Sequence, residues 1–275
     1  MINNILMKII RFFRGLFTRP PVKPFGYGKH CALMFAINRY QQSPLRGCLN
    51  DQEDMTFRIK LLWPEFVFRQ FKDSEVTRQR FKNEMLRAFA NMPEGHLVVT
   101  YSGHGTQMRN PKEIDGFSEA LYLYDGPVPD HERYEVMKQK PPKLNVVFIF
   151  DCCFSTGMTN PRKSDFHALP YRVPRFLEYE PIPAGFKRSK SAFHEEIDID
   201  WLAFAACQES ETAMDAYIGG RYNGAYTYYM KNIMRRDVSF MTWHKETRNY
   251  LPSKMFPQTP TLTGKHEMMD KLPFF

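Results

Sequence analysis

The chain has 275 residues, is 43% hydrophobic and carries a formal net charge of +8. A chain of this length and composition can bury the core of one large domain, or of two small ones, without disulfide bonds. Its five cysteines match neither a disulfide framework nor a zinc-binding spacing, which favours a reducing compartment and a cytoplasmic location. Six of the positive charges lie in residues 1–30, which contain no acid, so a net charge of only +2 is left for the other 245 residues. This distribution argues against nucleic acid as a partner of the main body.

Residues 1–19 have the pattern of a basic amphipathic helix, with apolar side chains on one face and lysine and arginine on the other. The interspersed charges exclude a transmembrane span, and the lack of an uninterrupted apolar core excludes a signal peptide. Three prolines then end the helix, so that residues 1–28 form a helix followed by a stiff linker. Two interpretations stay open: peripheral attachment to an anionic membrane surface, or packing against the domain itself or a partner protein.

From about residue 30 onward, short apolar runs alternate with helical patterns. Thr77 is the expected N-cap of one helix, and residues 144–151 form the most apolar of the expected strands. Strands that alternate with helices predict an α/β fold, with a mostly parallel central sheet and helices on both faces. The expected strands cover residues 30–38, 66–73, 96–105, 120–125, 144–151 and 259–264, and the expected helices cover residues 51–63, 77–92, 130–140, 225–236 and 240–251.

A proline-rich stretch at residues 159–198 has little periodicity and interrupts this alternation. Long irregular segments of this kind are usually functional or disordered. The stretch divides the chain into a larger region, residues 29–158, and a smaller region, residues 199–275.

Two of the expected strands end in residues that can carry chemistry. One ends in VVTYSGHG, which places His104 between glycines, and the other ends in VVFIFDCC, which contains Asp151, Cys152 and Cys153. Parallel strands bring their carboxyl ends to one edge of a sheet, where ligands bind. A cysteine nucleophile needs a base, and a histidine on a neighbouring strand end can supply it. Alone, a buried cysteine is usually inert and a histidine near a turn is usually structural, but the two together indicate a cysteine–histidine site.

Several segments resemble the motifs of caspase-like cysteine peptidases of the metacaspase group, which includes bacterial and phage forms. The resemblance covers residues 29–275 and implies a caspase-like fold, with residues 29–158 as the large (catalytic) subunit region, residues 159–198 as the linker between subunits and residues 199–275 as the small-subunit region. The matching segments are YSGHGTQ (101–107) for the histidine motif, FDCCFSTG (150–157) for the cysteine motif, LRGCLND (45–51), DGFSEALYLYD (115–125), AACQESETA (205–213), GRYNGAYTYY (220–229) and QTPTLTG (258–264).

The resemblance implies that Cys153 is the nucleophile, with its thiolate accessible at the tip of the strand, and that His104 is its proton-transfer partner. The backbone N–H groups of Gly105 and Cys153 would hold the oxyanion. Cys152 takes the variable position of the motif, and because side chains alternate along a strand we expect it to point away and to pack. Phe154 departs from the family pattern, which has a histidine after the nucleophile. That histidine is not the catalytic base, so we expect activity to survive the change.

The resemblance also places Asp51 and Asp151, beside Cys48 and Ser102, in the pocket for the residue before the scissile bond. Two carboxylates in a cleft favour arginine or lysine through charge-assisted hydrogen bonds and repel aspartate. We therefore expect a cysteine endopeptidase that cleaves protein or peptide substrates after Arg or Lys. For Asp51 the alternative is a plain helix N-cap, and the residue could serve both roles.

Metacaspases commonly bind calcium through several acids, and most of those acids are replaced here. The family's acidic run reads Asp130, His131 and Glu132 in this chain, so a histidine replaces its central acid. Ser118 stands where the family has an acid before EAL, and Asn160 stands where it has one after the nucleophile. Because a hard cation needs several carboxylate oxygens, we expect this calcium site to be weakened or lost, and we expect no other metal or cofactor.

The proline-rich linker carries seven basic residues: Arg162, Lys163, Arg172, Arg175, Lys187, Arg188 and Lys190. Exposed basic chain is a ready substrate for such an enzyme, so self-cleavage is expected, with Lys187, Arg188 and Lys190 as the best candidate sites. The alternative is that these basic residues only keep a loop solvated. The alternative function is a catalytically silent module with the caspase fold that mediates interactions or attaches to a membrane. The retained pair of a cysteine and a histidine at strand ends argues against the silent module.

Overall fold

The computed structural model describes residues 26–111, 116–153, 172–179, 199–208 and 211–274. Within these ranges a six-stranded sheet forms the centre of the molecule. Its strands are β1 (His30–Ala36), β2 (Val67–Lys72), β3 (Glu94–Ser102), β7 (Lys143–Asp151), β9 (Leu202–Ala205) and β12 (Thr261–Gly264), in the order β12-β9-β7-β3-β1-β2. All neighbours from β2 to β9 are parallel, and the edge strand β12 is antiparallel to β9. The predicted α/β fold with a mostly parallel sheet is confirmed.

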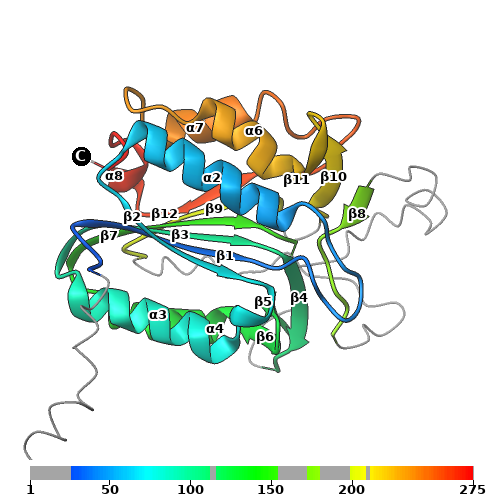
Figure 1. Ribbon diagram of the computed structural model, residues 1–275, viewed down its shortest axis with the longest axis horizontal. Coiled ribbons are helices and arrows are strands. Elements are labelled where there is room, and N and C mark those ends of the chain that lie inside the picture. Colours follow the sequence, from blue (N-terminus) through cyan, green and yellow to red (C-terminus); the bar gives the residue numbers. More distant parts are fainter. Residues whose placement is uncertain (1–25, 112–115, 154–171, 180–198, 209–210, 275) are drawn as a thin grey trace, which may run out of the picture.

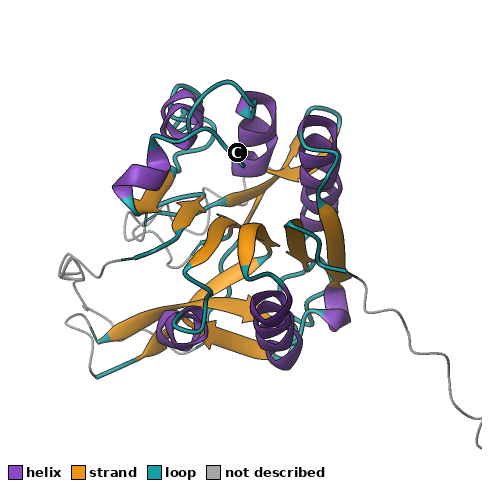
Figure 2. Ribbon diagram, turned by 90° about the vertical axis from the view of Figure 1, so that its left-hand side faces the viewer, coloured by secondary structure: helices purple, strands orange, loops and turns teal. Residues whose placement is uncertain are grey.

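Helices cover both faces of this sheet, as Figures 1 and 2 show. Because the inner strands are buried on both faces, their sequences are nearly continuous apolar runs. One face carries α3 (Arg78–Asn91) and α4 (Asp130–Met137), and the other carries α2 (Cys48–Leu62), α6 (Ala225–Ile233), α7 (Phe240–Thr247) and α8 (His266–Met269).

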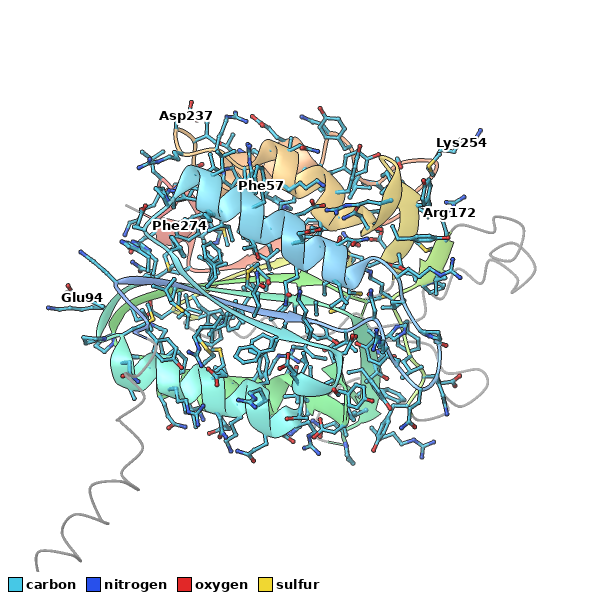
Figure 3. The ribbon with its side chains drawn as sticks, viewed as in Figure 1. Phe57, Glu94, Arg172, Asp237, Lys254 and Phe274 are labelled. Carbon is cyan, nitrogen blue, oxygen red and sulfur yellow. The ribbon has the colours of Figure 1, made fainter. Side chains whose placement is uncertain are left out.

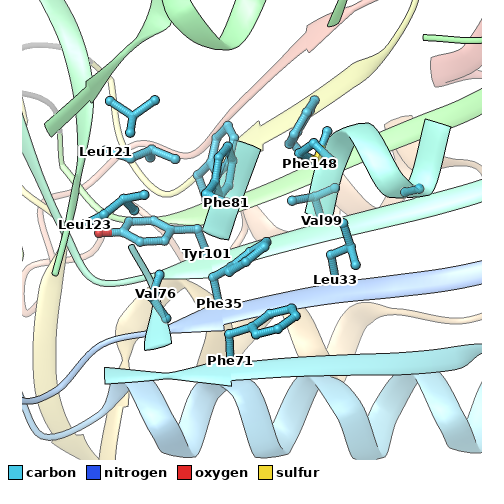
Figure 4. Packing of buried hydrophobic residues seen from close by; sticks show 14 of the residues in the cluster. Leu33, Phe35, Phe71, Val76, Phe81, Val99, Tyr101, Leu121, Leu123 and Phe148 are labelled. Atoms are coloured by element: carbon cyan, nitrogen blue, oxygen red, sulfur yellow. The ribbon is translucent and has the colours of Figure 1, made fainter. Parts of the chain in front are cut away.

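Each face of the sheet has its own hydrophobic core. In the core under α3, Phe35 stacks on Phe71 and contacts Phe81 of the helix (Figure 4). In the opposite core, Trp63 and Trp243 lie with their ring centroids 5.9 Å apart, and both are fully buried. Truncating a buried aromatic side chain of this size to alanine costs about 3–5 kcal/mol, so the two cores fix the sheet that carries the site.

Two small antiparallel sheets flank the edge at which the parallel strands end (Figure 1). They contribute the backbone groups described below. The first contains β4 (His104–Arg109), β5 (Phe117–Leu123) and β6 (Gly126–Pro129), and the second contains β8 (Arg172–Pro174), β10 (Met214–Ile218) and β11 (Arg221–Gly224).

Some boundaries differ from the expectation. Thr77 does cap α3, because its hydroxyl accepts the backbone N–H of Arg80. The expected strand at 96–105, however, is broken at Gly103, and His104 begins β4 instead of ending β3. The residue at this turn is a glycine because a side chain at position 103 would overlap the hydroxyl of Tyr101. The short strands β8, β10 and β11 were not predicted, and β8 lies inside the stretch that was expected to be irregular.

Candidate active site

The predicted site residues meet at the carboxyl ends of β3 and β7. Ser102 ends β3 and pairs in register with Asp151, the last residue of β7. His104 and Cys153 each follow two residues later. Helix α2 brings Asp51 in its first turn to the same place, where Ser102 Oγ donates a hydrogen bond of 2.6 Å to Asp51 Oδ2. Residues that are far apart in the sequence thus form one site.

A single arginine, Arg175, fills the pocket that these side chains line. Its Nη2 lies 2.6 Å from Asp51 Oδ2 and 2.8 Å from Asp215 Oδ1. Its Nη1 lies 3.1 Å from Asp151 Oδ1 and donates to Ser102 Oγ at 2.8 Å. Burial alone would lower the pKa of Arg175, but the surrounding carboxylates outweigh burial and raise that pKa well above its ordinary value. We call Asp51, Ser102, Asp151 and Asp215 the acidic pocket.

Asp51 points into the acidic pocket and does not cap its helix. The N-cap of α2 is Gly47, so the N-cap interpretation of Asp51 is wrong. The Asp51 carboxylate also accepts the backbone N–H of Gly224 at 2.9 Å. Burial raises the pKa of Asp51 to about 6, with the charge of Asp151 adding to the rise and the Arg175 guanidinium opposing it.

Cys48 was expected in the same pocket, and the structure places it at the start of α2. It is fully buried, and its backbone N–H donates to Asn38 Oδ1 at 2.9 Å. Burial raises the pKa of its thiol well above the ordinary value, against the lowering effect of Arg175. Cys48 therefore contributes a neutral wall to the pocket.

The third carboxylate, Asp215, was missed in the sequence. It is fully buried on β10. In addition to the hydrogen bond from the Arg175 guanidinium, its carboxylate accepts hydrogen bonds from the backbone N–H groups of Arg46 at 2.8 Å and of Gly47 at 2.9 Å. Its carboxylate therefore holds the start of α2 as well as the arginine. The available signal was an acid between apolar residues, since a buried carboxylate needs a partner.

The backbone of residues 172–177 threads between β10 and β4. Strand β8 pairs antiparallel with β10, and Arg175 N donates to Ala213 O at 2.9 Å. The carbonyl oxygen of Arg175 accepts two hydrogen bonds, from Gly105 N at 3.0 Å and from Cys153 N at 3.2 Å. The two N–H groups that were expected to hold an oxyanion thus converge on one carbonyl oxygen.

His104 is buried, and only one of its ring nitrogens has a partner. Nε2 lies 2.6 Å from Ser43 O, whereas Nδ1 has no hydrogen-bond partner among the described residues. Burial lowers the pKa of His104 to about 4, and the nearby backbone groups of Ser43 and Arg175 offset this only in part. At neutral pH the imidazole is therefore uncharged. With Nε2–H donating to Ser43 O, the lone pair is left on Nδ1.

The two adjacent cysteines point to opposite faces of the sheet, as predicted. Cys152 packs in the core under α3, and Cys153 lies in the opposite core. The expectation that the Cys153 thiol is accessible at the strand tip is wrong, because the residue is fully buried behind Arg175. Its Sγ–H donates to Ala213 O at 3.5 Å. Burial raises the pKa of this thiol well above its usual range, so Cys153 is protonated in this state.

The positions at which the family places calcium ligands do not fit a cation here. Glu132 already pairs with Arg78 at 3.3 Å, His131 replaces one acid, and Ser118 is buried and hydrogen-bonded. Asn160 lies outside the described residues. In the part of the chain that the structure describes, no group of three or more His, Cys, Asp or Glu is arranged to hold a metal ion.

Two predictions concern segments outside the described residues: the amphipathic helix at 1–19, and the self-cleavage candidates Lys187, Arg188 and Lys190. Phe154 lies outside them as well. Among the helices that are described, none combines the length and the apolar character that a membrane crossing requires.

The fold is shared with solved structures of low sequence identity. A Geobacter sulfurreducens protein of known crystal structure superimposes with a TM-score of 0.67 at 21% identity, covering 89% of this chain and 98% of that one. Caspase-1 of Spodoptera frugiperda superimposes with a TM-score of 0.55 at 12% identity, covering 92% of each chain. The caspase-like fold is confirmed.

The sequence comparisons identify the family. Metacaspase-1 of Scheffersomyces stipitis is 24% identical over 289 residues, which cover 87% of this chain and 71% of that protein. Metacaspase-1 of Botryotinia fuckeliana is 31% identical over 296 residues, which cover 90% of this chain and 70% of that protein. The model of the caspase domain family matches residues 29–270. The chain therefore belongs to the caspase domain family, has metacaspases among its relatives and is a cysteine-type peptidase.

Proposed function

We propose that this peptidase cleaves peptide bonds after arginine or lysine, with Cys153 as the nucleophile and His104 as the general base. Arg175 is the observation that carries the proposal. Its guanidinium meets three buried carboxylates, while its carbonyl oxygen accepts the N–H groups of Gly105 and Cys153. A peptide that is about to be cleaved needs both contacts at once: a pocket for the side chain and donors for the developing oxyanion.

The state of the two catalytic groups indicates general-base chemistry. His104 is neutral because its pKa is about 4, and Cys153 is a thiol because burial raises its pKa. Attack therefore has to be accompanied by proton transfer from Sγ to Nδ1 of His104. The Ser43 carbonyl supports this role because it accepts Nε2–H and so keeps Nδ1 unprotonated.

The acidic pocket favours arginine over lysine. Both terminal nitrogens of Arg175 are used: Nη1 donates to Ser102 Oγ and to the Asp151 carbonyl, and Nη2 donates to Asp51 and Asp215. A lysine ammonium is a single point charge and cannot span these acceptors as a planar fork does. An aspartate side chain would meet three carboxylates and be repelled. The expected order of substrates is therefore arginine, then lysine, with aspartate excluded.

The wider setting of the enzyme follows from the same reasoning. Its substrates are proteins or peptides with an accessible basic residue, and its five free, buried cysteines suit a cytoplasmic location. Attachment of residues 1–19 to an anionic membrane surface stays a prediction. It is tested by sedimentation with anionic vesicles, and it is wrong if a chain that begins at residue 26 sediments equally well.

The decisive experiment compares two fluorogenic peptides that differ only in the residue before the reporter, arginine or aspartate. The arginine peptide should be cleaved and the aspartate peptide should not. Cys153→Ala and His104→Ala should each abolish cleavage, whereas Cys152→Ala, a matched change on the other face of the sheet, should keep most of it. Preferred cleavage after aspartate would refute the specificity, and loss of activity in Cys152→Ala alone would refute the choice of nucleophile.

A further inference from the structure

The segment that fills the active site belongs to the chain itself. We propose that residues 172–177 are the enzyme's own first substrate: the chain cuts its Arg175–Phe176 bond and is blocked until it does so. This inference rests on the proposed function. It assigns self-cleavage to one bond, whereas the sequence pointed to Lys187, Arg188 and Lys190, which lie outside the described residues.

On the N-terminal side of this bond, the segment is held as an added strand. Strand β8 pairs antiparallel with β10, with Pro174 opposite Met214 and Val173 opposite Asp215. Arg172, labelled in Figure 3, extends from β8, and its guanidinium lies 5.8 Å from the ring centroid of Phe256. An extended peptide that adds to a sheet edge through backbone hydrogen bonds is a common mode of peptide recognition.

The C-terminal side of the bond is held as well. Phe176 forms a parallel bridge with Gly105, and Leu177 N donates to Gly105 O at 3.0 Å. Leu177 is buried. A basic side chain that merely filled an acidic pocket would need none of these backbone contacts. The segment is thus fixed on both sides of the Arg175–Phe176 bond, with the carbonyl group of that bond held by two donors.

The reaction at this bond uses only groups that are present, together with water. The Cys153 Sγ–H proton moves to His104 Nδ1 while sulfur bonds to the Arg175 carbonyl carbon, and the resulting oxyanion is held by Gly105 N–H and Cys153 N–H. The Arg175–Phe176 C–N bond then breaks, and the Phe176 nitrogen takes the proton from His104. Water hydrolyses the thioester, which gives an Arg175 carboxylate and restores the thiol.

Before this cut, the same segment excludes other substrates. Arg175 occupies the acidic pocket, its backbone N–H takes the carbonyl of Ala213, and Cys153 Sγ–H donates to that same carbonyl. Because the occupant is tethered, it competes at an effective concentration of roughly millimolar. A free peptide at micromolar concentration therefore cannot enter the pocket. The thiol has to turn from Ala213 O toward His104 Nδ1 before it can attack, so the first cut should be slow. We therefore expect a lag in the cleavage of free peptides.

The test follows freshly purified full-length protein over time by intact mass and by N-terminal sequencing, while an arginine peptide reports activity. A new N-terminus at Phe176 should appear, and peptide cleavage should accelerate in parallel. Cys153→Ala should stay whole. Arg175→Gln should also stay whole and cleave the peptide without a lag, because its side chain no longer pairs with the carboxylates. Arg175→Lys keeps the charge and should cut at the same bond about 30-fold more slowly, which covers the case in which Arg175→Gln fails to fold.

The control replaces Lys187, Arg188 and Lys190 together with glutamine, and this variant should still be cut after Arg175. The inference is overturned if the first cut of the wild-type chain lies elsewhere, or if Arg175→Gln is cut as fast as the wild type. It is also overturned if the wild-type chain stays whole while it cleaves arginine peptides, an outcome that leaves the proposed function standing. Absence of self-cleavage in the wild type together with absence of arginine-peptide cleavage in both the wild type and Arg175→Gln would refute the proposed function itself.

Discussion

Replacement of Asp215 by asparagine tests the acidic pocket at the residue that the sequence did not reveal. The change keeps the size of the side chain and one carbonyl oxygen, but it removes a charge that lies 2.8 Å from Arg175 Nη2 in a buried setting. Removing one partner of a buried hydrogen-bonded charge pair costs about 2–5 kcal/mol. Because Asp51 contacts the same nitrogen at 2.6 Å and stays in place, we expect the low end, about 2 kcal/mol, or about a 30-fold loss in kcat/KM for an arginine peptide.

The assay separates lost charge pairing from general damage. Each enzyme is measured with an arginine peptide and with a citrulline peptide, which has nearly the same shape without the charge, and the rates are referred to the processed fraction of the protein. Asp215→Asn should reduce cleavage of the arginine peptide strongly and that of the already poor citrulline peptide little. Asp200→Asn is the control, because Asp200 pairs with Lys140 at the opposite end of the sheet. It should leave both rates unchanged.

Equal losses with the two peptides would refute the reasoning. They would mean that Asp215 acts only through the backbone N–H groups of Arg46 and Gly47, which it also accepts. Thermal melting of the same samples shows whether that structural role dominates, since a large drop in Tm would accompany it.

Two further predictions concern pH and calcium. The kcat/KM for an arginine peptide should rise as the pH rises above about 6, because that pKa of Asp51 belongs to the pocket occupied by the Arg175 guanidinium, which lowers it; the empty pocket keeps its proton to a higher pH, and arginine binding strengthens as that proton leaves. A citrulline peptide should show a weaker rise, and equal slopes would contradict the assignment. Activity should be insensitive to a chelator, because Glu132 already pairs with Arg78 and His131 and Ser118 replace acids; a large stimulation by added calcium, measured on the chelator-treated enzyme, would show that other ligands form a site.

Much of the fold and part of the site could be predicted from local patterns. An apolar run that ends on Asp151, Cys152 and Cys153 indicates a buried strand with chemistry at its tip, and strand alternation separates the two cysteines onto opposite faces. These properties depend on periodicity over a few residues, which the sequence displays directly. His104 was placed near the cysteine for the same reason, although its strand assignment was wrong because the chain turns at Gly103.

The contents of the pocket depended on contacts between distant segments. Asp215 joins Asp51 and Asp151 only because β10 packs beside the start of α2, and nothing in its own stretch of sequence specifies that neighbour. Likewise, among the seven basic residues of the linker the sequence favoured Lys187, Arg188 and Lys190, and only the threading of one segment between β10 and β4 singles out Arg175. The same threading buries Cys153, which the sequence had placed at an open strand tip. The chemistry of each side chain and the periodic pattern of apolar residues can be seen in short stretches of the sequence. Which buried charge meets which carboxylate is decided by the packing of segments more than 20 residues apart.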